Sequence, residues 1–220
     1  MLPRVVGLLP TYNRPELAHR AAHLFIEQGY GGRLHLLVFD DGELPVPRPC
    51  STCDFELVRH ARVNLPTKRN RMMAHVSDPD AIYVMWDDDD YHGPARVRRQ
   101  VEALAEAEAD ACVLRPTLYY NQATRELRRS AWLSDATVAF RWNFWLAMAF
   151  DESRDPGSGR SFIRRSHLVN QPTIVEIDGE LDYITVVHPG QRHTPPEFNS
   201  IDFTEAPVGP EFADARLQLR

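Results

Sequence analysis

The chain has 220 residues, a length that suits one substantial domain, and 43% of them are hydrophobic, as is typical of a globular protein. No apolar run approaches the roughly 18 residues that a membrane-spanning helix requires. The first apolar stretch is also too short for a signal peptide. We therefore expect no membrane span and a cytoplasmic location. Three cysteines, an odd number, argue against a disulfide framework, and the net charge of −6 gives no general attraction to nucleic acid.

Strand-like and helix-like segments alternate through the first half of the chain, which is the pattern of an open α/β sheet. Helical spacing of apolar residues, with prolines suited to a first turn, predicts three helices at 15–28, 66–76 and 94–109. Residues 43–54 contain several prolines and are expected to form a loop. Apolar runs predict buried strands at 4–10, 34–39, 55–59, 81–86 and 111–120.

The second half of the chain is less regular. We expect a mixture of strands and a short helix at 128–150, a polar loop at 151–160 and strand material at 174–188. The interpretation is one domain of two merged halves with a tail. The halves are residues 1–120 and 121–194, and the Pro-rich tail is residues 195–220.

The strongest chemical signal is the run of four aspartates from Asp87 to Asp90, at the C-terminal end of a predicted strand. Adjacent carboxylates repel one another, so a buried strand is not expected to end in them without a compensating cation. Mg²⁺ and Mn²⁺ prefer oxygen ligands, and Mg²⁺ is usually held by one or two carboxylates together with substrate phosphates. The alternative interpretation is an acidic turn that caps the following helix.

Two other predicted strands also end in polar, loop-forming residues, at 10–15 and at Asp40-Asp41-Gly42. Ligands of open α/β sheets bind beyond the carboxyl ends of the strands, so one crevice can collect all three segments. Lys68 and Arg69, near the start of a predicted helix, are suited to meet a diphosphate. Taken singly, each motif has an ordinary alternative as a turn or as a solvated helix face.

Together the four motifs resemble glycosyltransferase family 2, over residues 4 to about 120. The resemblance implies the A-type glycosyltransferase fold, in which a nucleotide-binding, mostly parallel α/β sheet flanked by helices merges with a smaller acceptor-binding part. Residues 180–185 are similar to segments of some bacterial polysaccharide-synthesising members. The matching segments are Pro10-Thr11-Tyr12-Asn13-Arg14-Pro15, Asp40-Asp41-Gly42, Lys68-Arg69-Asn70 and Trp86-Asp87-Asp88-Asp89-Asp90.

The resemblance implies transfer of a sugar, with inversion, from a nucleoside-diphosphate sugar of the UDP, dTDP or GDP type to an acceptor hydroxyl. It implies that Asp89 coordinates Mn²⁺ or Mg²⁺, with His188 as a further metal ligand, although a surface histidine is the alternative. Such a metal stabilises the leaving diphosphate. The residues implied to bind the nucleotide are Pro10, Thr11, Tyr12, Arg14, Asp40, Asp41, Lys68, Arg69, Asp87 and Asp88, with Asp88 facing the ribose or the sugar.

The catalytic base is where the sequence departs from the family pattern. Family members usually carry it in a Glu-Asp or Gly-Asp pair near the start of a helix in the second half, and residues 157–161 hold no acid at the corresponding position. Asp155 is our first choice for the base and Asp182 the second. Each has an alternative interpretation as a solvated charge at a loop or strand end.

The acceptor stays open between a polysaccharide, a small molecule and hydroxymethylated bases in DNA. Clustered arginines favour the DNA acceptor and the acidic net charge disfavours it. A catalytically silent protein that binds sugar nucleotides is the alternative from another functional class. Cys50 and Cys53 lack the further ligands that a zinc site requires. The clustered arginines are Arg125, Arg128, Arg129, Arg160, Arg164 and Arg165.

Overall fold

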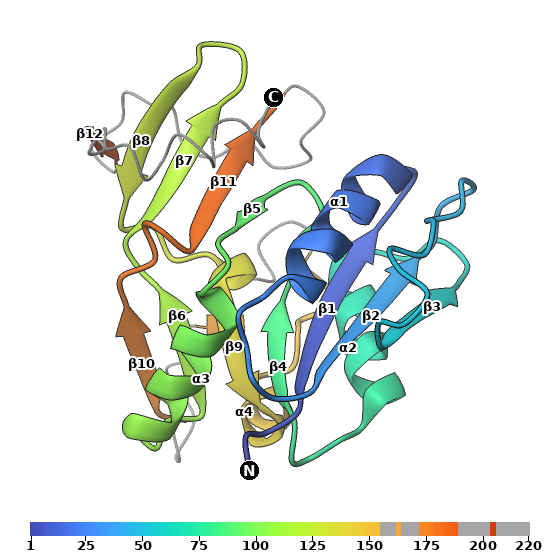
Figure 1. Cartoon of the computed structure of the whole chain (residues 1–220), viewed down its shortest axis with the longest axis horizontal. Coiled ribbons are helices and arrows are strands. Elements are labelled where there is room, and N and C mark those ends of the chain that lie inside the picture. The colour runs from blue at the N-terminus through green and yellow to red at the C-terminus, as the bar shows by residue number, and fades with distance from the viewer. Residues whose placement is uncertain (155–161, 164–171, 189–202, 206–220) are drawn as a thin grey trace.

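The computed structural model describes residues 1–154, 162–163, 172–188 and 203–205. Within these ranges the chain forms two sheets (Figure 1), and the larger one has the strand order β10-β6-β9-β4-β1-β2-β3. Strand β9 runs antiparallel to both of its neighbours, and the other pairings of this sheet are parallel. Its strands are β1 (Val5–Thr11), β2 (Leu34–Asp40), β3 (Phe55–Arg59), β4 (Ile82–Met85), β6 (Ala111–Leu114), β9 (Val138–Arg141) and β10 (Ile174–Ile177).

Helices cover both faces of this sheet, and a separate apolar cluster lies under each pair. On one face, helices α1 (Pro15–Ile26) and α3 (Arg96–Glu106) pack through residues such as Phe25 and Val101. On the other face, α2 (Leu65–Val76) and α4 (Trp142–Met148) pack through Met72 and Phe144. All seven residues of β1 are buried, as expected for a central parallel strand covered on both faces. These helices and strands confirm the predicted α/β architecture.

The smaller sheet has the strand order β12-β8-β7-β11-β5. Its strands β7, β8 and β11 lie at the upper left of Figure 1, above β6 and β10 of the larger sheet. It encloses its own small cluster, with Leu118, Ile184 and Val186 at the centre. Its strands are β5 (Tyr91–His92), β7 (Thr117–Asn121), β8 (Glu126–Ser130), β11 (Tyr183–Val187) and β12 (Phe203–Glu205), and the short 3-10 helix η1 (Asp135–Thr137) precedes β9.

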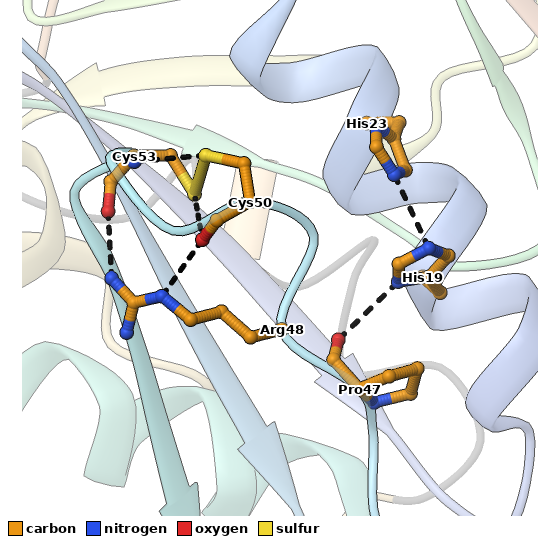
Figure 2. Close-up of a disulfide and its surroundings, with 6 residues drawn as sticks. All are labelled: His19, His23, Pro47, Arg48, Cys50 and Cys53. Atoms are coloured by element: carbon orange, nitrogen blue, oxygen red, sulfur yellow. Dashed lines mark hydrogen bonds between the residues drawn. A yellow bond between two sulfur atoms is a disulfide. The ribbon is translucent and has the colours of Figure 1, made fainter.

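Two expectations about these elements are wrong. The single strand predicted at 111–120 is divided into β6 and β7, which belong to different sheets. Pro116 lies at the division, where it has no N–H to donate to a strand ladder. The expectation of no disulfide also fails, because Cys50 and Cys53 are bonded to each other in the loop after β2 (Figure 2). The third cysteine, Cys112, is buried and free.

No helix within the described ranges combines the length and the apolar character that crossing a bilayer requires.

Gly93 follows β5, packs against the turn before β11 and has no room for a side chain. A Cβ atom there would lie 2.3 Å from the carbonyl oxygen of Leu181 and 2.9 Å from Cα of Asp182, and backbone atoms cannot rotate away. We expect Gly93→Ala to lower the free energy of unfolding by about 1–3 kcal/mol, measured by urea denaturation. Gly29→Ala is the control, because a Cβ atom there would lie 3.5 Å from the carbonyl oxygen of Pro94, an ordinary van der Waals contact. Equal urea midpoints for the two variants would contradict this account.

Candidate functional site

The polar residues that follow β1, β2 and β4 meet at one edge of the larger sheet. Strand β1 lies between β4 and β2, and Thr11 at its end pairs in register with Asp40 at the end of β2. The aspartate run begins one residue after Trp86, whose N–H donates to the Leu8 carbonyl of β1. The expected crevice beyond the carboxyl ends of the strands therefore has its residues in place.

The four aspartates alternate between buried and open positions. Asp88 and Asp90 are buried, with exposures of 1% and 4%. The side chains of Asp87 and Asp89 keep 25% and 15% of their surface exposed. The run therefore has two partly exposed and two buried carboxylates, which alternate through the bend at residues 88–90.

Asp90 attaches the run to the smaller sheet. Its carboxyl group accepts hydrogen bonds from the Tyr183 hydroxyl and, at 2.9 Å, from the Val186 N–H of β11. Burial raises the pKa of Asp90 well above its ordinary value, and the charges of Asp89 and Asp87 add to the effect. The role of this residue is structural.

Asp88 is held from the β1–α1 segment. The Thr11 hydroxyl donates to it at 2.6 Å, and Arg14 approaches its other oxygen at 2.7 Å. Burial raises the pKa of Asp88 to about 7, although the charge of Arg14 opposes the rise. The sequence analysis expected Asp88 to face the ribose or the sugar. In the structure its side chain is buried.

Asp89 faces the crevice and contacts two positively polarised groups. Its Oδ2 accepts from Arg14 at 2.6 Å and lies 3.2 Å from Nε2 of His188. Burial opposes its ionisation, but the hydrogen bonds from His188 and Arg14 and the charge of Arg14 outweigh burial and lower the pKa of Asp89. The structure thus brings together the two residues that the sequence indicated as metal ligands.

The donor set of this pair fits a divalent cation. Two ligands about 2.1 Å from an octahedral cation and at right angles to each other lie about 3.0 Å apart, close to the 3.2 Å between Asp89 and His188. Among the described residues, no group of three or more His, Cys, Asp and Glu side chains could hold a metal. A cation at this pair would therefore take its other ligands from a diphosphate and water.

Lys68 is buried and supports the crevice from below. Its ammonium group donates to the Thr11 carbonyl at 2.7 Å and to Asp41 at 2.5 Å. Burial opposes the ionisation of Asp41, but the bonds from Lys68 and from the Val63 N–H outweigh burial and lower its pKa. Several predicted residues thus form one continuous series of contacts: Asp41, Lys68, Thr11, Asp88, Arg14, Asp89 and His188.

Arg69 orients the second open carboxylate. It is 2% exposed, lies 3.1 Å from Asp87 and also pairs with Asp135 of η1. Its guanidinium group stacks over the Phe150 ring at 5.2 Å. Asp135 was not predicted from the sequence, because nothing in the pattern around it indicates that η1 reaches the crevice.

Two arginines near the end of β3 complete the rim of the crevice. Arg59 donates to the fully buried carboxylate of Asp40 at 2.6 Å. Arg62 stacks on the ring of Tyr12, with its Cζ 3.4 Å from the ring centre, and donates to Asp41. Sequence reasoning did not include these arginines. The rule that polar residues at strand ends share a crevice would have found them, because they follow β3.

The remaining predicted residues lie outside this series of contacts. Pro10 is buried within β1. Asp182 is 2% exposed and pairs with Arg99 of α3, so it stabilises the attachment of the smaller sheet instead of facing the crevice. Burial raises its pKa, against the charge of Arg99. Asp155 falls outside the described residues.

The family of the chain follows from comparison with known proteins. The model of Glycosyl transferase family 2 matches residues 8–167, and the chain belongs to this family. The comparison with curated proteins found no match.

Solved structures with the same architecture include S. aureus TarS, at 14% identity and a TM-score of 0.62, covering 84% of this chain and 37% of that one. The structure of S. aureus TarS 1-349 in complex with UDP-GlcNAc gives 12% identity, a TM-score of 0.63 and coverages of 86% and 60%. Mannosyltransferase PcManGT from Pyrobaculum calidifontis, in complex with GDP-Man and Mn²⁺, has 16% identity and a TM-score of 0.59. The match covers 87% of this chain and 59% of that one. The chain spans less than two thirds of each of these proteins, and the likeness confirms the A-type fold.

The buried guanidinium of Arg69 gives a test of the site's internal charge balance. Arg69→Met would leave Asp87 and Asp135 without their counter-charge, which typically costs about 3–5 kcal/mol for a buried pair. We expect a loss of this size in the free energy of unfolding, measured by urea denaturation. Arg98→Met is the control, because its pair with Glu102 is half exposed and contributes about 0.3–0.5 kcal/mol. Similar losses in both variants would show that Arg69 does not balance these charges.

Proposed function

We propose that the chain is a metal-dependent glycosyltransferase that moves a sugar, with inversion, from a nucleoside-diphosphate sugar to an acceptor hydroxyl. The observation that carries the proposal is the pairing of Asp89 with His188 at 3.2 Å, at the edge where the strand ends of the nucleotide-binding half meet. Membership of glycosyl transferase family 2 supports it. So do the sugar nucleotides in two of the similar structures and the Mn²⁺ in one of them.

In this proposal Asp89 and His188 hold Mn²⁺ or Mg²⁺, which offsets the charge that develops on the leaving diphosphate. Asp89 is suited to this work because its lowered pKa keeps it ionised at neutral pH. Asp87 faces the same crevice and is oriented by Arg69, so it is available to the ribose or the sugar. Asp88 lies buried between Asp87 and Asp89 in the chain, where it accepts a hydrogen bond from Thr11. It contributes no exposed oxygen.

In this proposal the nucleotide base lies next to Tyr12 and Asp40. The Tyr12 ring is 40% exposed and already carries a planar cation, the guanidinium of Arg62, on its face. A base is also planar and stacks on aromatic rings, so it would replace or sandwich Arg62. Asp40 is the hydrogen-bond acceptor for the base edge, and its present partner Arg59 would have to turn aside. We infer a donor of the UDP, dTDP or GDP type.

The catalytic base that we propose is Asp155, which would take the proton of the acceptor hydroxyl. The rival position, Asp182, is buried and committed to Arg99. For the acceptor, we retain a polysaccharide or a small molecule. The DNA acceptor loses support because two of the arginines that suggested it are paired with carboxylates, Arg128 with Glu126 and Arg129 with Glu180.

Asp89→Asn tests the metal site. With Mn²⁺ present, we expect one nucleoside diphosphate among UDP, GDP, dTDP, CDP and ADP to raise the melting temperature of the unaltered protein. At 100 times the dissociation constant, this stabilisation is about 2.7 kcal/mol, which corresponds to a rise of roughly 5–10 °C in the melting temperature of a chain of this length. The shift should vanish with EDTA or in Asp89→Asn. Asp78→Asn is the matched control, because Asp78 pairs with Arg4, which precedes β1 at the opposite edge of the sheet. An undiminished shift in Asp89→Asn would remove the metal assignment.

Asp155→Asn tests the base. A lost general base typically lowers turnover by about 10²–10⁴-fold, and we expect this fall in kcat without a change in nucleotide affinity. Asp151→Asn, four residues away in the same segment, is the control. Full activity in Asp155→Asn would exclude it as the base. Nucleotide binding without any transfer in the unaltered protein, whatever the acceptor, would favour the catalytically silent alternative.

A further inference from the structure

Helix α1 carries two histidines on one side, away from the aspartate run. His19 and His23 are four residues apart, so they lie one turn above the other on the same face. Their Nε2 atoms are 3.2 Å apart, and the rings meet edge to face with centroids 4.6 Å apart. Both side chains are partly exposed, and Figure 2 shows the two rings meeting on the side of α1 that faces the loop after β2.

The separation of the two nitrogens suits a shared metal ion. Two imidazole nitrogens about 2.0–2.1 Å from one cation lie about 2.9 Å apart at a right angle and about 3.4 Å apart at a tetrahedral angle. The observed 3.2 Å falls between these values. A rigid helix holds both rings, so little rearrangement is needed to bind.

The loop after β2 supplies the outer partner that metal-binding histidines usually have. Nδ1 of His19 lies 3.3 Å from the carbonyl oxygen of Pro47 (Figure 2). A carbonyl can only accept, so this contact places the ring proton on Nδ1 and leaves the lone pair of Nε2 directed toward His23. The same loop is closed by the disulfide between Cys50 and Cys53, and Arg48 donates to the carbonyl oxygens of both cysteines.

A hollow of about 480 Å³ lies beside His19, between the start of α1 and the loop. Glu16, one turn before His19, lies on its wall and adds a carboxylate to the surroundings. The remaining lining residues are Pro15, Pro45, Val46 and Pro47, and none of these has a charged side chain.

We propose that His19 and His23 form a binding site for a divalent transition metal of the Zn²⁺, Ni²⁺ or Cu²⁺ type, with water completing the coordination. Imidazole favours these ions, whereas Mn²⁺ is lowest in the general affinity order and prefers oxygen ligands. The site is therefore distinct in chemistry from Asp89 and His188. On binding, neutral His23 changes tautomer: its single ring proton leaves Nε2 and Nδ1 takes one up from water, so that the Nε2 lone pairs of both rings are free for the metal. A bound metal strengthens the contact of His19 with Pro47 and so fastens the loop to α1.

The test is a calorimetric titration of the oxidised, metal-free protein with Zn²⁺, in the His188→Ala background so that the aspartate-run site does not contribute. We expect one equivalent of Zn²⁺ to bind, and His23→Gln to weaken binding at least tenfold while the far-ultraviolet circular dichroism stays unchanged. Nitrogen-15 spectra of the histidine rings should show Zn²⁺-dependent shifts at Nε2 of both His19 and His23.

Two outcomes would overturn the proposal. They are absence of Zn²⁺ binding in the His188→Ala protein, and equal binding with and without His23→Gln. Because Asp89 is unaltered throughout, failure here leaves the proposed transferase activity untouched, and loss of nucleotide binding in Asp89→Asn leaves this site untouched.

Discussion

The repulsion between four consecutive carboxylates is the constraint around which this chain is organised. The charges of the run are compensated by groups from several distant parts of the chain, and Arg14 serves both Asp88 and Asp89. The run can therefore form only when those parts are assembled. The partners are Arg69 for Asp87, Thr11 and Arg14 for Asp88, Arg14 and His188 for Asp89, and Tyr183 with the Val186 N–H for Asp90. Segments far apart in the sequence thus depend on one short loop for their mutual position.

The same constraint explains how the two sheets are joined. Asp90 bonds to β11 of the smaller sheet, whereas Asp88 bonds to β1 of the larger one. Close by, the Arg96 guanidinium donates to carbonyl oxygens of Met85 and Ala136 and lies over the Tyr183 ring. Burial lowers the pKa of Arg96 to about 10, which still leaves it charged at neutral pH. The partly exposed carboxylates therefore rest on a layer of buried hydrogen bonds and ion pairs.

Much of the fold was predictable because apolar runs and helical spacing are local signals. The strands β1, β2 and β4 and the helices α1 and α2 were expected close to their observed bounds. Contacts between residues far apart in the sequence could not be predicted. No local pattern indicates that Asp135 forms an ion pair with Arg69, or that Asp182 forms one with Arg99. The disulfide was missed for a related reason, because the number of cysteines says nothing about which two lie together.

Within the site, it was easier to predict which residues take part than to predict where their side chains point. The run from Asp87 to Asp90 was expected to hold a cation, but which carboxylates face outward depends on the bend at residues 88–90 and on the burial of alternate side chains. The proximity of His188 to Asp89 depends on β11, which lies almost one hundred residues further along the chain. The sequence indicated each residue, and only the assembled sheets bring the pair to within 3.2 Å.

Arg14 has a consequence for the order in which ligands arrive. Its two terminal nitrogens lie 2.7 Å from Asp88 and 2.6 Å from Asp89, so the protein already carries a cation of its own where an external one would go. A divalent ion alone must compete with this tethered charge. A diphosphate offers Arg14 an alternative anionic partner and frees the carboxylate at the same moment. In the function proposed above, metal and donor would therefore be coupled through one exchange of ion pairs, and each would bind more readily when the other is present.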